Sequence, residues 1–429
     1  MTAALILGFA VALAIGVPVA LTMGIASFVA IEVGGTYPLL VLPQRLFGGI
    51  NSFPLMAVPL FILAADLMTA GKLTEALLRH TYLLVGHVRG GLGHVNILTS
   101  MLFAGISGSA LADAAGPGAI VMRMMWTGGY PKYYAAALSA TTATIGPIIP
   151  PSIIAVIYAV TDSRVTVAGL FLAGVVPGVM LALALAIANH VISTRNGYQS
   201  AGRRASFGAI ARSLLPALPG LAMPVIILGG ILGGIFTATE AAAVAAAYAL
   251  LVSVVVLRSL RWRDLPSVFL RSGLLTSAVL LIVSMASVFS WLLTILRVPQ
   301  MLATWLGSIT DSRALTLILL AVFILLCGLV IDTLPAVIIL TPILAPVAAN
   351  VGIDPLHFAM ILVLNLAIGM VTPPIGPVLF VIATVGNLRL ERVARAVLPL
   401  LFAELIVLAL VIAFPQLSLA VPRLFGFTR

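Results

Sequence analysis

Two short polar segments interrupt the apolar stretches of this sequence, at residues 105–118 and 328–335. Their oxygen-bearing side chains are Ser107, Ser109 and Asp113 in the first segment and Asp332 and Thr333 in the second. A charge at the centre of a transmembrane helix costs about 2.5–3.5 kcal/mol on insertion scales. A carboxylate in such surroundings is therefore a candidate for binding an ion or a substrate, and Asp332 is the strongest candidate.

Each polar segment is followed by a Gly-x-x-x-Pro-Pro motif, Gly146–Pro151 and Gly369–Pro374. Proline removes a backbone donor and clashes with the preceding helical turn, and the residue before it is pushed out of the helical region. We therefore predict two helices that unwind within the membrane and expose carbonyl oxygens. The alternative is a simple proline kink.

Small hard cations bind oxygen ligands, and transporters supply these from unwound carbonyls and helix ends. We predict one Na⁺ site where each polar segment faces its own broken helix. The first site would use the side chains of Ser107 and Ser109 and the carbonyls of Gly146, Ile148 and Pro151. The second would use the side chains of Asp332, Thr333 and Thr372 and the carbonyls of Gly369 and Met370. The alternative for the two serines is helix packing by small residues.

Four other acidic residues lie within or beside apolar stretches, namely Asp66, Asp113, Glu240 and Glu404. Asp113 either serves function or caps the second arm of its segment. Thr237 and Glu240 have the spacing of a capping box, which favours a structural role for Glu240. Glu404 lies within an apolar run and is a candidate for the same reason as Asp332.

The run Gly105–Gly108 also matches the Gly-x-Ser-Gly of intramembrane serine proteases. Such an enzyme needs a histidine base within hydrogen-bond reach of the serine. The histidines lie in polar connections, at the end of a span or at a helix start, and Ser109 replaces the last glycine of the nucleophile-elbow pattern. We therefore expect a protein that is not an enzyme.

The composition shows what positions these residues. Of the 429 residues, 62% are hydrophobic and only 8% are charged, against about 25% charged in soluble domains. The clearest apolar runs predict an all-α polytopic membrane protein embedded in a lipid bilayer. They are Ala3–Ile31, Val167–Ile192, Ser213–Ile235, Ala241–Leu257, Gly273–Leu296, Leu315–Ile331 and Val393–Phe414.

The net charge of +10 comes from arginines in short connections, including Arg195, Arg203, Arg204 and Arg212. Basic short loops are typical of the cytoplasmic side. A nucleic-acid partner is not expected, because no recognition module accompanies the basic residues.

An internal repeat relates the two halves. A shift of 223 residues places Gly105 on Gly328, Ile145-Gly146 on Ile368-Gly369, Pro150-Pro151 on Pro373-Pro374 and Ser109 on Asp332. Repeats with interrupted helices at matching positions indicate a secondary transporter. The flanks of the first segment, Ile97–Ala104 and Ala119–Met125, are too short to span, so we predict a re-entrant helical hairpin in each repeat.

The predicted organisation has four parts. Residues 1–50 form N-terminal scaffold helices, and 51–193 form the first repeat with hairpin 1 and a broken helix. Residues 194–270 form basic connections and further scaffold helices, and 271–429 form the second repeat.

The chain resembles the large membrane subunit of TRAP (tripartite ATP-independent periplasmic) transporters along essentially its whole length. The residues that carry the resemblance are Gly16–Pro18, Ser52–Leu55, Gly105–Ser109, Ala112-Asp113, Pro150–Ser152, Gly234–Thr237, Thr239-Glu240, Thr341-Pro342, Gly352–Pro355 and Pro373-Pro374. Departures from the family pattern are Gly116-Pro117, Ala65 and Ala238, which bear on the shape of the hairpin.

The resemblance implies an elevator-type transport domain and Na⁺-coupled import of a small organic anion, such as a C4-dicarboxylate or a sugar acid. It implies a multi-pass protein of the bacterial inner membrane, with Na⁺ as coupling ion and no covalent cofactor. A separate small TRAP membrane subunit and a periplasmic substrate-binding protein are the expected partners. By the family pattern, Ser109, Ser152 and Asp332 face the substrate. A passive anion channel is the alternative.

Overall fold

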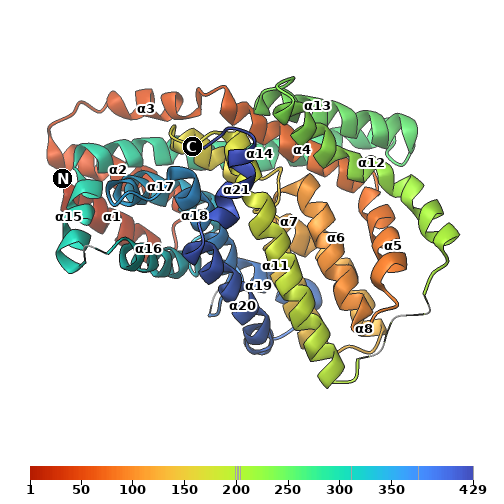
Figure 1. The fold of residues 1–429 in the computed structure, drawn as a ribbon. Coiled ribbons are helices and arrows are strands. Elements are labelled where there is room, and N and C mark those ends of the chain that lie inside the picture. Colours follow the sequence, from red (N-terminus) through yellow and green to blue (C-terminus); the bar gives the residue numbers. More distant parts are fainter. Residues whose placement is uncertain (199, 201, 203, 311, 375, 429) are drawn as a thin grey trace.

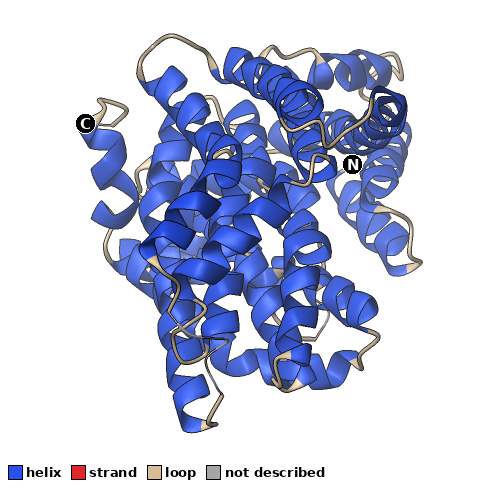
Figure 2. Ribbon diagram, turned by 90° about the vertical axis from the view of Figure 1, so that its right-hand side faces the viewer, coloured by secondary structure: helices blue, strands red, loops and turns tan. Residues whose placement is uncertain are grey.

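The computed structural model describes residues 1–428 except 199, 201, 203, 311 and 375. Arg203 of the basic connection therefore lies outside the described residues. The described part is helical, with short loops and no strand (Figure 2). The prediction of an all-α protein is confirmed.

The first half of the chain runs from α1 to α11. Its elements are α1 (Thr2–Ala14), α2 (Val19–Gly34), α3 (Val41–Ile50), η1 (Pro54–Met56), α4 (Ala57–Ala70), α5 (Leu73–Val85), α6 (Gly91–Ser107), α7 (Ala110–Asp113), η2 (Ala114–Gly118), α8 (Ala119–Thr127), α9 (Lys132–Ala143), α10 (Ile153–Thr161) and α11 (Val167–Arg195).

The second half runs from α12 to α21. Its elements are α12 (Phe207–Leu232), α13 (Ala238–Leu251), η3 (Val252–Val256), η4 (Trp262–Asp264), α14 (Leu265–Ile295), α15 (Val298–Ile309), α16 (Arg313–Gly328), α17 (Thr333–Asn350), α18 (Pro355–Gly369), α19 (Pro377–Gly386), α20 (Leu390–Ala413) and α21 (Gln416–Leu424).

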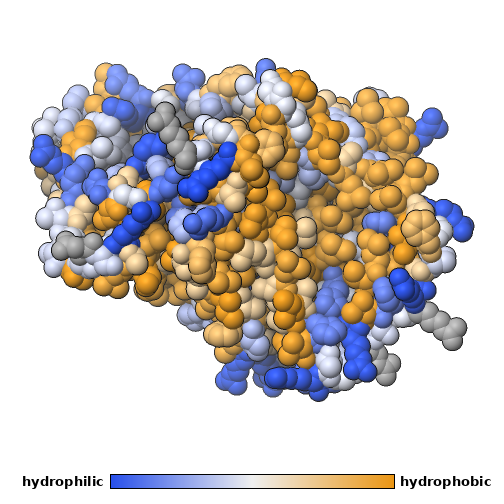
Figure 3. All heavy atoms as spheres, in the orientation of Figure 1, coloured by the Kyte–Doolittle hydropathy of each residue, from blue (hydrophilic) through white to orange (hydrophobic). Residues whose placement is uncertain are grey.

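Six helical segments within the described residues are long and apolar enough to cross a membrane, or seven if the bent pair α3 and η1–α4 forms one span. Hydrophobic residues cover the middle of the face in Figure 3, while hydrophilic residues gather at its lower edge and on the left. The chain is therefore a multi-pass membrane protein.

The predicted single span Ala3–Ile31 is wrong, because the structure divides it into α1 and α2, which pack against each other. Gly16 adopts a left-handed conformation with φ +84°, and Pro18 is the N-cap of α2. Hydropathy did not reveal this turn, because Gly16 and Pro18 interrupt the helix without introducing a charged residue into the apolar run.

Helix α14 packs along α2 and α3 and also contacts α4, in the group of helices at the upper left of Figure 1. The predicted boundary between residues 270 and 271 falls inside this helix, and the boundary between 193 and 194 falls inside α11. The start of the predicted second repeat therefore packs with the N-terminal helices.

The elements around the two polar segments begin at matching positions. Ser109 is the N-cap of α7 and Asp332 is the N-cap of α17, the pair that the shift of 223 residues superposes. Helices α9 and α18 begin at Lys132 and Pro355, which the same shift relates. These boundaries support the predicted repeat.

Candidate functional site

The first hairpin turns at Gly108 and Ser109. Helix α6 ends where Gly108 adopts a left-handed conformation with φ +58°, which glycine allows without a steric penalty. The Ser109 hydroxyl then caps α7 by accepting a hydrogen bond from the Ala112 amide at 3.4 Å. The returning arm, α7 to α8, packs back along α6.

The arms of this hairpin are longer than the sequence predicted. Residues 105–107 continue α6, and the returning arm continues through Gly116-Pro117 as a π-helical turn, η2. Proline is tolerated there because a π-turn changes which amides must pair. This departure from the family pattern therefore leaves the returning arm helical.

The first broken helix lies between α9 and α10. Its residues 144–152 form turns and bends and include the cis bond between Pro150 and Pro151. The Ser152 hydroxyl donates to the Pro147 carbonyl at 2.5 Å and accepts from the Ala155 amide at 3.2 Å. Ser152 therefore forms a hydrogen bond within the break and caps α10.

The tip of the hairpin packs directly on this break. A Cβ added at Gly108 would lie 2.5 Å from the Pro151 carbonyl oxygen, and one added at Gly146 would lie 3.2 Å from the Ser109 carbonyl oxygen. The distance at Gly108 is too short for any side chain, and the distance at Gly146 is shorter than an ordinary contact, so glycine at both positions allows this close approach. The structure thus packs the turn at Gly108 and Ser109 against Gly146 and Pro151, and the Na⁺ ligands expected there stay a prediction.

The second hairpin turns between α16 and α17. The Asp332 carboxylate caps α17 by accepting from the Thr333 amide at 2.8 Å. The Thr333 hydroxyl is buried and has no hydrogen-bond partner among the described residues. The end of α16 packs against the end of α18, where the second break begins, through a contact between Gly328 and Gly369. A Cβ added at Gly369 would lie only 2.8 Å from the Gly328 Cα.

The carbonyl oxygens of the second break are partly engaged. Gly369 accepts from the Thr372 amide at 3.0 Å, and Met370 accepts from the Val378 amide at 3.1 Å. Each carbonyl has a second lone pair for another partner. The Thr372 hydroxyl donates back to the Ile368 carbonyl at 2.8 Å, so its oxygen also keeps acceptor capacity.

One small cavity of about 50 Å³ lies between the two hairpin tips and the two breaks. Ser109 from the first tip faces Asp332 and Thr333 from the second across this cavity. Its lining is completed by Gly108, Ala110, Leu111, Pro147, Ile153, Ile154, Leu334 and Met370. The cavity joins both halves of the chain, which sequence spacing alone did not show.

Seven residues predicted for the site do not line this cavity, namely Ser107, Gly146, Ile148, Pro151, Ser152, Gly369 and Thr372. Ser107 is buried, and its hydroxyl oxygen accepts a long contact of 3.5 Å from the Ser109 amide. The Ile148 carbonyl oxygen packs directly against Gly174 of α11, where there is no space for a Cβ. The Ser152 hydroxyl donates to the Pro147 carbonyl within the break, and Ser152 does not line the cavity.

Glu404 on α20 reaches the first break from the far end of the sequence. It is fully buried, and the Thr144 hydroxyl oxygen lies 2.7 Å from its Oε1. The same hydroxyl oxygen lies 2.6 Å from the Thr141 carbonyl. Because one hydroxyl hydrogen cannot serve both contacts in full, this geometry favours a carboxyl group that carries its own hydrogen.

Sequence reasoning noticed the acid at 404 but missed its partner. Nothing in the spacing of residues 144 and 404 indicates a contact, and only the packing of α20 on α9 creates it.

Other predicted roles are resolved by side-chain contacts. Thr237 and Glu240 form the predicted capping box at the start of α13. Asp113 does not cap α7, since Ser109 holds that position. His80 pairs with Ser213 and His357 with Ser418, at 2.9 and 2.7 Å, so neither is the base of a Ser107 protease.

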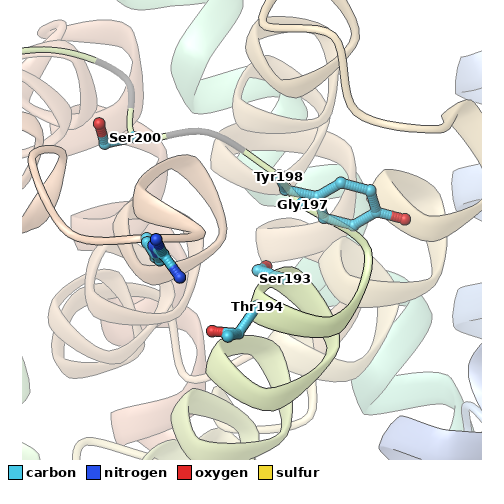
Figure 4. Close-up of a pocket in the computed structure, with 6 residues that line it drawn as sticks. Ser193, Thr194, Gly197, Tyr198 and Ser200 are labelled. Atoms are coloured by element: carbon cyan, nitrogen blue, oxygen red, sulfur yellow. The ribbon is translucent and has the colours of Figure 1, made fainter.

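A larger cavity of about 340 Å³ lies away from the hairpin tips, at the end of α11 (Figure 4). Ser193, Thr194, Gly197, Tyr198 and Ser200 line it in the close-up, together with Arg89. Burial raises the pKa of the Tyr198 phenol. This cavity contains none of the predicted site residues.

Comparison with known proteins places the chain among membrane transport proteins. Residues 6–417 match the family model described as "Tripartite ATP-independent periplasmic transporter, DctM component". The chain is 40% identical over 385 residues to the sialic acid TRAP transporter large permease protein SiaM of Vibrio cholerae, with 89% of each chain covered. It is 36% identical over 440 residues to the C4-dicarboxylate TRAP transporter large permease protein DctM of Rhodobacter capsulatus, covering 99% of this chain and all of that one.

Among solved structures, the YdaH transporter of Alcanivorax borkumensis is similar with a TM-score of 0.63 and 14% identity. The match covers 91% of this chain and 89% of that chain. At this identity the likeness concerns the fold alone.

Proposed function

The chain belongs to the DctM family of tripartite ATP-independent periplasmic transporters, and from this membership we propose that it imports a small organic anion together with Na⁺. The proposed cargo is a carboxylate, in the range from C4-dicarboxylates to sugar acids. Its location would be the bacterial inner membrane.

The observation that carries the proposal is the cavity between the hairpin tips. Its lining includes the carboxylate of Asp332 and, among the described residues, no lysine or arginine. An anion that enters beside Asp332 is repelled in low dielectric unless positive charge enters with it. Na⁺ bound at the tips would supply this charge, so binding of the anion and of the cation would depend on each other.

The ligands proposed for the second Na⁺ site are consistent with this role. The unpartnered Thr333 hydroxyl and the Met370 carbonyl both belong to the lining of the cavity. An unpartnered buried hydroxyl costs free energy unless a ligand satisfies it. For the first site, the side chains of Ser107 and Ser109 with the Gly146 and Pro151 carbonyls would provide the corresponding oxygens. The Ile148 carbonyl, which lies against Gly174, would have to turn away from α11 to join them.

Transport would need two further proteins. A periplasmic binding protein would deliver the anion and a small membrane subunit would complete the permease, as the family name implies for its members. In the proposed elevator movement, the hairpins and broken helices move together against scaffold helices that include α1, α2, α3 and α14. Selectivity would then rest largely with the binding protein.

The test is uptake into proteoliposomes that contain this chain, the small subunit and the binding protein. A Na⁺ gradient should drive accumulation, and replacement of Na⁺ by K⁺ should abolish it. Uptake that is unchanged in K⁺ would refute the coupling. Downhill flux without the binding protein that does not saturate would instead favour the passive anion channel.

One variant links the coupling to the cavity. Thr333→Val removes the hydroxyl but keeps the shape, and should raise the Na⁺ concentration for half-maximal uptake by about 10-fold, a loss of about 1.4 kcal/mol. The control is Thr341→Val on the same helix, another buried threonine with an unpartnered hydroxyl, about 12 Å farther along α17. Equal Na⁺ dependence in both variants would remove Thr333 from the site.

A further inference from the structure

The first hairpin holds a buried carboxylate that the proposed transport sites do not use. Asp113 ends α7, and its side chain is completely buried. Neither of its carboxylate oxygens has a hydrogen-bond partner among the described residues. The Ser100 hydroxyl on α6 is its side-chain neighbour, but the geometry falls short of a hydrogen bond, and this hydroxyl is unpartnered as well.

The neighbouring face of α6 adds a further oxygen. Asn96 and Ser100 are four residues apart on this helix and therefore lie on one face. The Asn96 amide nitrogen donates to the Ser139 hydroxyl of α9 at 2.7 Å, and its Oδ1 is buried without a partner in the described structure. Four buried oxygen atoms are thus unsatisfied on these elements, two from Asp113 and one each from Asn96 and Ser100.

Close packing holds these elements together. Helix α6 contacts α7, η2 and α9. A Cβ added at Gly118 would lie 3.0 Å from the Asp113 carbonyl and 3.6 Å from the Ser139 carbonyl. The segment that carries Asp113 is therefore seated between the helix of Ser100 and the helix of Ser139.

Charge decides what such a group of oxygens binds. Neither ion pair found among the described residues includes Asp113; they join Arg164 to Asp162 and Arg271 to Asp66. A proton on Asp113 would supply one donor for several oxygens. A monovalent cation would neutralise the carboxylate and contact several oxygens together, whereas a divalent cation would leave an uncompensated positive charge in the membrane.

We propose that Asp113, Ser100 and Asn96 form a third site for a monovalent cation of the Na⁺ type, inside the first hairpin and separate from the tips. The ligands are the Asp113 carboxylate, the Ser100 hydroxyl and the Asn96 carbonyl oxygen. The bound cation ties the returning arm of the hairpin to α6 and, through Asn96, to Ser139 of α9. The choice of Na⁺ as the cation rests on the proposed function, whereas the binding measurement that tests the site does not require uptake.

The test counts Na⁺ bound to the purified permease, this chain with its small subunit, using radiolabelled Na⁺. Asp113→Asn keeps the shape of a protonated carboxyl but removes the charge, and should lower the number of bound ions by one. Ser100→Ala should weaken binding of that ion by about 10-fold or more. The control is Ser27→Ala, a buried serine of α2 whose hydroxyl bonds its own helix at the Met23 carbonyl.

Unchanged Na⁺ number and affinity in both Asp113→Asn and Ser100→Ala would overturn the site and indicate a protonated Asp113. If Asp113→Asn does not fold, Ser100→Ala still decides, because it removes a single hydroxyl. The two proposals fail separately. Na⁺-independent uptake by the unmodified protein, with one fewer ion bound by Asp113→Asn, would refute the coupling but keep this site.

Discussion

Gly108 and Gly35 offer a matched test of how the first hairpin tip holds its break. Both residues end a helix in the left-handed conformation, with φ +58° and +57°. They differ in their surroundings. A Cβ at Gly108 would lie 2.5 Å from the Pro151 carbonyl oxygen and 3.1 Å from the Ile153 amide nitrogen, whereas described atoms leave the space at Gly35 open to 4 Å.

The structure gives the expected magnitudes. Alanine at either position pays about 1–2 kcal/mol for the left-handed conformation. Gly108→Ala must also move the tip from Pro151 by about 1 Å to reach an ordinary contact, and such overpacking typically costs about 1–3 kcal/mol. Gly35→Ala should therefore cost about 1–2 kcal/mol of stability, and Gly108→Ala about 2–5 kcal/mol.

Two measurements separate the cost of the left-handed backbone from the cost of the contact with Pro151. Thermal unfolding of the purified permease should show a larger loss for Gly108→Ala than for Gly35→Ala. If the additional 1–3 kcal/mol destabilises the ion-bound conformation of the tip, the Na⁺ concentration for half-maximal uptake rises by about 5- to 150-fold in Gly108→Ala. It should stay unchanged in Gly35→Ala. Equal unfolding and equal Na⁺ dependence in the two variants would refute the argument that the tip rests on Pro151.

Three further predictions follow from single contacts. Glu404→Gln should retain uptake, because an amide can donate to Thr144 as the neutral carboxyl does. Glu404→Ala should lower the unfolding free energy by about 2–5 kcal/mol. Equal loss of uptake in both variants would indicate that the charged carboxylate is needed. Asp332→Ala should abolish uptake with normal membrane insertion, and near-normal uptake would exclude Asp332 from the site. Asp354→Ala removes the acceptor of the Leu356 and His357 amides and should lower stability by about 1 kcal/mol without altering Na⁺ dependence, which uptake at several Na⁺ concentrations would check.

Much of the fold follows from local sequence. Apolar runs predict α11 and α20 to within three residues of their observed bounds, and α12, α13 and α14 to within eight. Glycine and proline predict the two breaks, because the backbone restrictions of these residues act wherever they lie. The same restrictions at Gly16 and Pro18 were overlooked where hydropathy was continuous, and this joined α1 to α2.

The site was predictable only in part. Ser109, Asp332 and Thr333 are polar residues in apolar surroundings. Ser109 is next to Gly108 and Asp332 follows Gly328 by four residues, so their type and position reveal them. Glu404 and Thr144 meet across 260 residues of sequence, and no local pattern connects them. The hydroxyl of Ser152 looked available from the sequence, but the fold of the break directs it to the Pro147 carbonyl.

The sequence by itself therefore determined the membrane class, the two broken helices and the oxygen-rich turns, because hydropathy and backbone restrictions are local properties. Only the tertiary structure decided that Ser109 and Asp332 line one cavity. It also decided that Asp113 and Glu404 are buried away from that cavity. The physical reason is that burial and partner choice depend on which helices pack together, and close approaches through glycine, such as Gly328 on Gly369, are set by the whole chain.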